Sequence, residues 1–135
     1  MSDTDLIRDI VRAQAEAWSR GDANGYAANA GEDLAFTNIR GQRWIGREHF
    51  VRVHTSVLNG VYAGSRLDAE VEHVSFPGEN VAVAEILLRL SNPKGMPAGI
   101  SPDADGGLRT RLLEIFERRD DEWTLMACHN TTVIA

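Results

Sequence analysis

A carboxylate in the last fifth of the chain is the first candidate for chemistry. Glu114 alternates with Leu112 and Phe116 in the segment Leu108–Glu117, so the three side chains leave one face of a predicted strand. A carboxylate held among apolar side chains has a raised pKa, because burial penalises its charged form. Such a group can donate a proton or a hydrogen bond to a carbonyl oxygen. We therefore predict Glu114 as a catalytic residue; the alternative is a polar group that only fixes the core.

The predicted strand Val81–Leu90 carries charged side chains on one face only. That face holds Glu85 and Arg89, and we expect it to line a cavity together with Glu114. Glu85 would then be a second catalytic carboxylate, and repulsion between two carboxylates raises one pKa further. Arg89 is a predicted ligand-binding residue, although a buried ion pair without chemistry is the preferred interpretation for it. The opposite face is expected to form a subunit interface and comprises Ala82, Ala84, Ile86, Leu88 and Leu90.

A histidine lies on the apolar stripe of the predicted helix Gly46–Leu58. His54 shares its face with Phe50 and Val57 at helical spacing. An imidazole titrates near neutral pH and can act as a general acid or base, which makes His54 a third catalytic candidate. The alternative is a hydrogen-bonded core histidine, which is the commoner role in such a stripe, and both interpretations remain open.

Two neighbouring polar residues of the last predicted strand, Trp123–Val133, compete for the cavity. Successive side chains of a regular strand point to opposite faces, so only one of His129 and Asn130 can face inward. Parity with Met126 and Cys128 favours Asn130, whereas a bulge after Trp123 would favour His129. Both are therefore ligand-binding candidates. Because Cys128 and His129 are adjacent, they make a poor catalytic dyad, and a buried inert thiol is predicted.

Four further ligand-binding candidates come from earlier in the chain. Gln14 and Trp18 belong to the first predicted helix, and Gln14 interrupts its apolar stripe. Gln14 is either partly solvated at the edge of that stripe or directed into a polar cavity. Asn38 lies in a short predicted strand, and Trp44 precedes the helix that carries His54.

The elements that must position these residues are helices first and strands after. Helices are predicted at residues 2–20, 22–30 and 46–58, and strands at residues 34–39, 66–76, 81–90, 108–117 and 123–133. This order predicts an α+β fold in one domain, residues 1–135, with a curved antiparallel sheet wrapped around the helices as a cone. The segment Ser91–Gly107 is rich in Pro, Gly and Asp, and we expect disorder there rather than a functional lid.

Composition and charge exclude several classes of function. The net charge of −6 and the lack of a basic stripe speak against nucleic-acid binding. No run of about eighteen apolar residues occurs, so no membrane span is expected, and the acidic N-terminus is unlike a secretory signal, which predicts a cytoplasmic protein. The four histidines show no metal-ligand spacing and no Gly-rich phosphate loop is present, so neither a metal nor a cofactor is expected.

Several short motifs, taken in order, resemble those of a known superfamily. They are W-S-R-G-D at Trp18–Asp22, F-T-N-I-R-G at Phe36–Gly41, W-I-G-R-E-H-F at Trp44–Phe50, G-S-R at Gly64–Arg66 and W-T-L-M-A-C-H-N-T at Trp123–Thr131. The chain resembles the nuclear transport factor 2-like superfamily, which includes ketosteroid isomerase, scytalone dehydratase and SnoaL-like polyketide cyclases, and is most similar to its SgcJ/EcaC group. The resemblance implies a cystatin-like α+β cone, a deep hydrophobic pocket and a homodimer formed through the outer sheet face.

The chain departs from the enzymes of that superfamily at their catalytic positions. Ketosteroid isomerase has a carboxylate base, a phenol and a protonated carboxylic acid, and residue order places Asn38, Gln14 and Glu114 there. An amide cannot accept a proton near neutral pH, so the isomerase base is absent. Scytalone dehydratase uses a histidine pair with a carboxylate, and His54 is the one histidine expected in the pocket. Neither mechanism transfers to this chain.

Three hypotheses about function follow. The preferred one is a cofactor-independent enzyme or accessory protein of enediyne or polyketide-type antibiotic biosynthesis, because SgcJ-type members resemble such accessory proteins. It would bind a hydrophobic, oxygenated small molecule, and Glu114 with Glu85 or His54 would move a proton in a cyclisation, dehydration or isomerisation. The second is a non-catalytic ligand-binding module, and the third is a dimerisation domain whose pocket is incidental.

Overall fold

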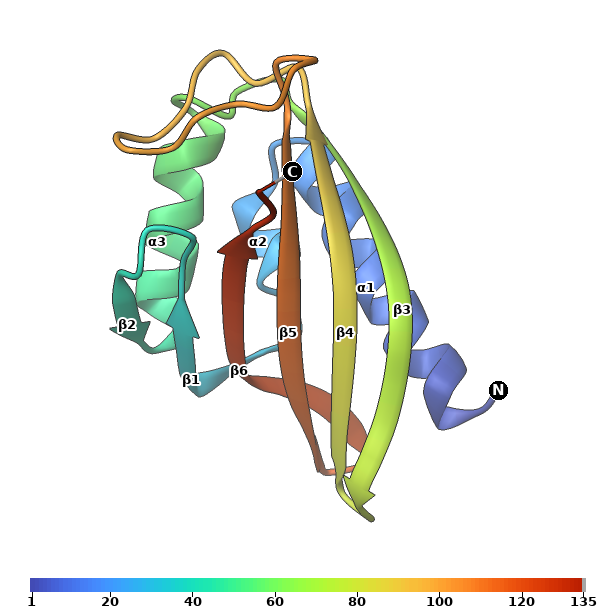
Figure 1. Cartoon of the computed structure of the whole chain (residues 1–135). Coiled ribbons are helices and arrows are strands. Elements are labelled where there is room, and N and C mark those ends of the chain that lie inside the picture. Colours follow the sequence, from blue (N-terminus) through green and yellow to red (C-terminus); the bar gives the residue numbers. More distant parts are fainter. Residues whose placement is uncertain (135) are drawn as a thin grey trace.

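The computed structural model describes residues 1–134, which fold into helices packed on one side of a curved sheet (Figure 1). The elements are α1 (Asp3–Ser19), α2 (Ala23–Tyr26), β1 (Ala30–Thr37), β2 (Arg43–Ile45), α3 (Arg47–Leu58), β3 (Arg66–Gly78), β4 (Val81–Ser91), β5 (Leu108–Arg119) and β6 (Glu122–Thr132). The predicted α+β fold with three helices is confirmed. Within the described residues, no helix combines the length and the apolar character that crossing a bilayer requires.

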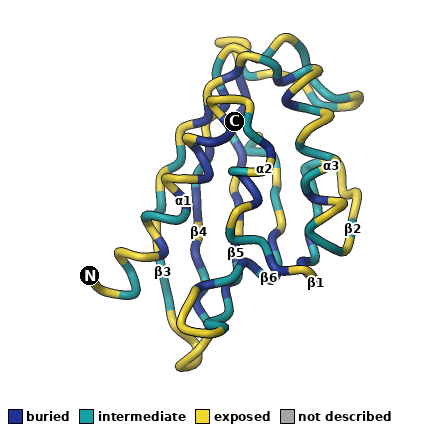
Figure 2. The backbone as a smooth tube through the Cα atoms, turned by 180° about the vertical axis from the view of Figure 1, so that it is seen from behind, coloured by how far each residue is buried: buried dark blue, intermediate teal, exposed yellow. Residues whose placement is uncertain are grey.

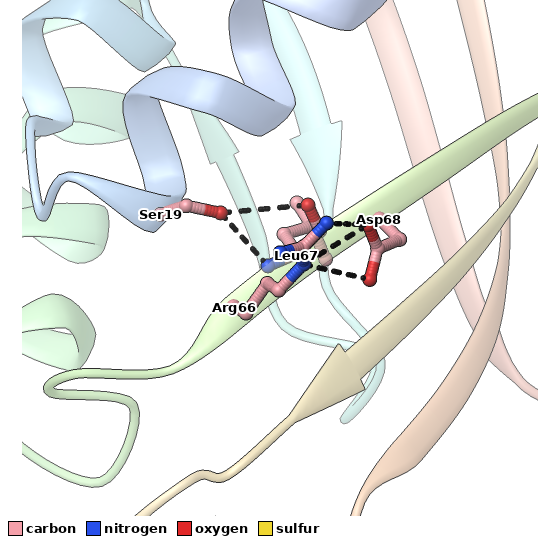
Figure 3. A network of polar contacts seen from close by, with 4 residues as sticks. All are labelled: Ser19, Arg66, Leu67 and Asp68. Carbon is pink, nitrogen blue, oxygen red and sulfur yellow. Dashed lines mark hydrogen bonds and ion pairs between the residues drawn. The ribbon is translucent and has the colours of Figure 1, made fainter.

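The first helix is fixed at both ends by side-chain hydrogen bonds. At its start, the Ser2 hydroxyl accepts from the Asp5 N–H, and the Asp5 carboxylate accepts from the Ser2 N–H, which forms a capping box. At its end, the Leu67 N–H donates to the Ser19 hydroxyl oxygen at 3.0 Å, and the hydroxyl donates to the Leu67 carbonyl at 3.4 Å (Figure 3). These bonds hold the last turn of α1 against the first residues of β3 and thereby orient Trp18 toward the interior.

The sheet contains one parallel pair of strands that the sequence pattern does not predict. Its strand order is β2-β1-β6-β5-β4-β3, and every pair is antiparallel except β1 with β6. The chain reaches β6 only after β2, α3 and three further strands, so no tight turn forces β1 and β6 to run in opposite directions. The short strand β2 is missing from the sequence prediction because three residues show no measurable period. The second helix ends at Tyr26 rather than at Ala30, where β1 already begins.

The strands alternate between more and less buried residues (Figure 2), and the burial pattern of β4 shows which face of the sheet lies inside. Its wholly apolar face, from Ala82 to Leu90, is buried in the core against the helices, so the prediction that this face forms a subunit interface is wrong. Glu85 and Arg89 lie exposed on the outer face, so the prediction that they line the cavity with Glu114 is also wrong. The helices cover one face only, and covering the more apolar one removes more apolar area from water.

The long segment between β4 and β5 is folded, and the expectation of disorder is wrong. It lies over the end of α3 (Figure 1), where the N–H groups of Lys94 and Gly95 donate to the Val61 carbonyl. Met96 and Ile100 pack against the core, and an ion pair of 3.5 Å joins Asp103 to Arg109 at the base of β5. Apolar anchors and backbone hydrogen bonds therefore close this end of the cone.

Candidate functional site

A cavity of about 400 Å³ opens between the concave face of the sheet and the three helices. This volume is within the range of small-molecule sites, roughly 300 to 1,000 Å³. Aromatic side chains form much of its wall, and they are Trp18, Tyr26, Phe36, Trp44, Phe50, His54 and Tyr62. The remaining lining is largely aliphatic, with polar side chains at the β1–β2 turn, on α3 and on the inner faces of β5 and β6.

The aromatic wall is held rigid by contacts between its own members. The indole N–H of Trp18 donates to the Ser65 hydroxyl at 3.0 Å. The rings of Tyr26 and Phe50 are stacked with centroids 5.6 Å apart, and those of Phe36 and Trp44 are stacked at 5.3 Å. Such packing gives each ring a defined position before any ligand enters.

His54 is both a hydrogen-bonded histidine and a residue of the cavity wall. Its Nδ1 lies 2.8 Å from the Phe50 carbonyl oxygen, which can only accept, so Nδ1 carries the proton and donates it. The other nitrogen, Nε2, therefore holds a lone pair. Burial lowers the pKa of His54 to about 4, against the opposing effect of the bond to Phe50. The ring is neutral at neutral pH and can accept a hydrogen bond or a proton from a ligand.

Glu114 carries a buried carboxyl group on the inner face of the sheet. Glu114 lies on β5, where it pairs with Ala84 of β4 on one side and with Cys128 of β6 on the other, and it is 2% exposed. The Gln14 amide donates to Oε2 at 3.2 Å, while Oε1 has no hydrogen-bond partner within residues 1–134. Burial raises the pKa of Glu114 to about 8, in spite of the bond from Gln14, so the expected upward shift is confirmed. Glu114 is thus a neutral acid at neutral pH.

Neither Glu114 nor Gln14 lines the cavity itself. The wall next to them consists of Leu112 and Cys128, which flank Glu114 on the same inner face. Gln14 is buried and points toward Glu114, so the interpretation of a partly solvated stripe edge is wrong. The Gln14–Glu114 pair therefore forms a polar site behind the cavity wall.

Asn130 faces the cavity and His129 does not. Asn130 lines the cavity, and its Oδ1 is buried without a hydrogen-bond partner in the described part of the chain. His129 is exposed on the outer face, with Nε2 3.2 Å from the Thr37 hydroxyl. The strand has a bulge at Met126, but it lies before Cys128, so the parity that links Cys128 to Asn130 is unaffected. The placement of His129 in the ligand site is wrong.

The other predicted ligand-binding residues are divided between the cavity and the outer surface. Trp18, Trp44 and Asn38 line the cavity. The Asn38 side chain is engaged in its own turn, where Oδ1 accepts from the N–H groups of Arg40 and Gln42. Arg89 instead lines a separate hollow of about 790 Å³ between the outer sheet face and residues 99–105.

Tyr26 is a cavity residue that the sequence pattern does not reveal. It belongs to α2, whose four residues are too few to show a helical stripe. Burial raises the pKa of its phenol well above the ordinary value, with Glu114 and Cys128 as smaller contributors, so the hydroxyl remains a neutral donor. Its ring centroid lies 4.8 Å from that of His54. The sequence feature that could have indicated a cavity residue here is a single tyrosine in a segment otherwise rich in Ala, Gly and Asn.

The thiol of Cys128 has no partner for nucleophilic chemistry. Burial is the largest cause that raises the pKa of the thiol well above its ordinary range, and His129 is on the opposite face. The prediction of a buried thiol without a dyad is confirmed. Among residues 1–134, no three His, Cys, Asp or Glu side chains gather closely enough to hold a metal ion.

Comparisons with solved structures place the fold among known relatives. A domain of unknown function with a cystatin-like fold from Nostoc punctiforme is 26% identical, with a TM-score of 0.84 over 98% of this chain and 78% of that one. An NTF-2 like protein of unknown function from Shewanella oneidensis is 19% identical, with a TM-score of 0.77 over 96% and 99% of the two chains. A ketosteroid isomerase-like protein from Erwinia carotovora is 14% identical, with a TM-score of 0.74 over 96% and 95%.

The sequence itself supports a family assignment. No curated protein matches the chain. The sequence profile of the SnoaL-like domain matches residues 11–126, a range that runs from the middle of α1 to the last strand and includes every cavity-lining aromatic residue. The protein therefore belongs to the SnoaL-like domain family.

Proposed function

We propose that the protein binds a hydrophobic, oxygenated small molecule in the aromatic cavity and moves a proton on it without a cofactor. One observation carries this proposal. The pKa order of an ordinary glutamate and histidine is reversed, since the pKa of Glu114 is about 8 and that of His54 about 4. The site therefore keeps a proton on the carboxyl group and a lone pair on the imidazole at the same pH. Pairs of groups with separated pKa values are typical of acid and base catalysts.

The proposed step uses the two neutral groups together. The Nε2 of His54 removes a proton from a carbon next to a ligand carbonyl and becomes an imidazolium. Because Leu112 and Cys128 form the wall in front of Glu114, this carboxyl group gives its proton to the carbonyl oxygen when those two side chains move aside. The transfer leaves a carboxylate and an enol.

In each outcome, an isomerisation, a dehydration or a cyclisation, the enol O–H returns its proton to Glu114 as the carbonyl forms again. In an isomerisation, His54 gives its proton to a different carbon of the conjugated system. In a dehydration, a hydroxyl on the neighbouring carbon leaves as water with the His54 proton; in a cyclisation, the enol carbon bonds to a second carbonyl carbon of the ligand, whose oxygen takes that proton. The Tyr26 hydroxyl and the Asn130 amide can orient the ligand oxygen by hydrogen bonds.

The biological setting is part of the same proposal. The order of motifs from Trp18–Asp22 to Trp123–Thr131 supports an SgcJ/EcaC-type member that serves enediyne or other polyketide antibiotic biosynthesis. The aromatic wall suits the planar, polyoxygenated intermediates of such pathways.

Deuterium exchange into 2-tetralone tests the proton transfer, because this aromatic ketone has acidic C–H bonds and needs no cofactor. We expect the protein to accelerate exchange in D2O, followed by proton NMR. The His54→Gln variant should lose about a hundredfold or more of that rate, since general base catalysis contributes on that order. Glu85→Gln, on the outer face, is the control and should keep the full rate. Unchanged exchange in His54→Gln would contradict the proposal.

A second candidate is a non-catalytic binding module. The observation in its favour is that Glu114 lies behind the cavity wall rather than in it. This alternative predicts that 2-tetralone or a larger aromatic ketone binds in the cavity and exchanges deuterium no faster than in D2O without the protein.

We also propose that the protein forms a homodimer through the outer sheet face. That face carries a band of apolar side chains near the middle of β4, β5 and β6, where Leu113 is 40% exposed. The band comprises Val83, Leu87, Leu113, Ile115 and Ala127.

A further inference from the structure

The cavity has a charge opposite to that of the whole protein. The chain carries a net charge of −6, but no aspartate or glutamate is among the residues that line the cavity. Two arginines, Arg40 and Arg52, do line it. A cleft of one sign on a protein of the other sign concentrates ligands of opposite charge.

Arg40 is presented by a turn whose backbone is fixed. The turn between β1 and β2 is closed by Asn38, whose Oδ1 accepts from the Arg40 N–H at 3.0 Å, and Gly41 adopts a positive φ of 76° that suits glycine. The Arg40 guanidinium has no acidic partner within 4.0 Å in the described chain. Eight other arginines do have one, and they are Arg12, Arg20, Arg52, Arg66, Arg109, Arg111, Arg118 and Arg119.

Arg52 approaches the same cavity from α3. Its partner is Glu48, one turn earlier, at 3.1 Å, and the two side chains are 65% and 88% exposed. An exposed helical pair of this kind contributes only about 0.3 to 0.5 kcal/mol. The guanidinium of Arg52 can therefore turn to a stronger anionic partner at the cavity rim with little loss.

The interior of the cavity cannot hold a charge well. Its wall is aromatic and aliphatic, and His54 and Glu114 are both neutral near pH 7. An ionised group of a ligand would lose its hydration there without gaining a partner. A charged ligand must therefore place its ring system inside and its charged group at the rim.

We propose that the ligand is an aromatic molecule that carries an anionic oxygen group, held at the cavity rim by Arg40 and Arg52. This inference rests on the proposed binding function of the cavity and adds the chemical class of the ligand. Guanidinium groups bind carboxylate, sulfonate or phosphate oxygens through paired hydrogen bonds. The two arginines then determine which end of the ligand enters and so place its uncharged end near His54 and Asn130.

Two fluorescent probes that differ by one anionic group test this inference. They are 8-anilinonaphthalene-1-sulfonate and its neutral counterpart N-phenyl-1-naphthylamine. We expect Arg40→Gln to weaken binding of the sulfonate about fivefold, as one partly exposed charge pair would, and to leave the neutral probe within about twofold. Arg52→Gln should act in the same direction. Arg43→Gln, on β2 outside the cavity, is the matched control and should change neither probe.

The failure of this inference is separable from the failure of the cavity function. If Arg40→Gln weakens the binding of both probes equally, or changes the binding of neither, the proposal of an anionic ligand is wrong. If N-phenyl-1-naphthylamine does not bind, or if filling the cavity with Val57→Trp leaves its affinity unchanged, the cavity function itself is wrong. Stronger competition by 2-naphthoate or 2-naphthyl phosphate than by methyl 2-naphthoate supports the class, and the ranking of the two anions tells a carboxylate from a phosphate. Equal competition by the neutral ester contradicts it.

Discussion

At the scale of single residues, Glu114 and His54 should make stability depend on pH in opposite ways. The pKa of Glu114 is about 8 in the folded state and 4.5 ordinarily. Between these two pH values the folded state binds more protons than the unfolded state, so the free energy of unfolding falls as the pH rises. His54 has a pKa of about 4 when folded and 6.5 ordinarily, so the unfolded state holds the extra proton there and stability rises with pH. Between about pH 4.5 and 6.5 the two effects cancel, and above pH 6.5 only Glu114 acts.

The first prediction concerns the free energy of unfolding measured with urea from pH 4.5 to 8. The unfolding free energy of the wild type should be nearly constant up to pH 6.5 and then fall by about 2 kcal/mol by pH 8. Each pH unit changes this free energy by about 1.4 kcal/mol for each proton by which the two states differ. Glu114→Gln should instead gain stability up to pH 6.5 and then stay constant. His54→Gln should lose stability across the whole range.

The exposed carboxylate Glu85 provides the control for this series. Glu85→Gln should follow the wild-type curve, because the Glu85 side chain is exposed on the folded chain and outside its core. A Glu114→Gln variant that still loses stability above pH 6.5 would show that another group binds the proton.

At the scale of elements, the end of the folded segment between β4 and β5 depends on one close backbone approach. A Cβ added to Gly107 would lie 2.3 Å from the Leu90 carbonyl oxygen, which belongs to the neighbouring strand. The Gly107 carbonyl also accepts from the Asp103 N–H, the residue that pairs with Arg109. The start of β5 and the closed end of the cone therefore depend on a residue without a side chain.

The second prediction is that Gly107→Ala destabilises the protein by about 1 to 3 kcal/mol, as overpacking against rigid backbone does. Gly78→Ala is the matched control, since a Cβ there meets no atom within 4 Å. Thermal unfolding of both variants measures the difference. Equal melting temperatures would mean that β4 and β5 separate at this point at no cost.

At the scale of the whole molecule, the helices cover one face of the sheet and leave the other free for a second copy. The apolar band on the outer face is interleaved with polar residues, since Leu113 of β5 pairs with Glu85 of β4 on one side and with His129 of β6 on the other. Because Leu113 is 40% exposed and lies outside the core, we expect its substitution to affect the proposed association more than folding.

The third prediction is that sedimentation at micromolar concentration gives the mass of a dimer and that Leu113→Glu gives a monomer. Burying an unpaired carboxylate in an apolar interface is unfavourable by several kcal/mol. The unfolding free energy of the monomeric variant, extrapolated to low concentration, should be close to that of the wild type. A wild-type monomer under these conditions would remove the outer face as a dimer interface.

Much of the fold could be predicted because the spacing of apolar residues along the chain indicates helices and strands. Alternation placed Glu114, Leu112 and Phe116 on one face, and helical spacing placed His54 beside Phe50. The site was predicted less well, because β4 has apolar residues on both faces and its pattern cannot say which one the helices cover. That ambiguity led to Glu85 and Arg89 being predicted on the wrong face of the sheet. Tyr26 was missed for another reason, because the four residues of α2 are too few to show a helical stripe.

The sequence by itself determined the types and order of the elements and which residues share a face, because backbone geometry converts residue spacing into direction. Only the tertiary structure decided which face is buried, which strands are neighbours and which polar atoms lack partners. These depend on contacts between distant segments, such as Gln14 with Glu114 and β1 with β6. The same contacts set the pKa values of Glu114 and His54, since desolvation is a property of the assembled core rather than of a residue's neighbours in the chain.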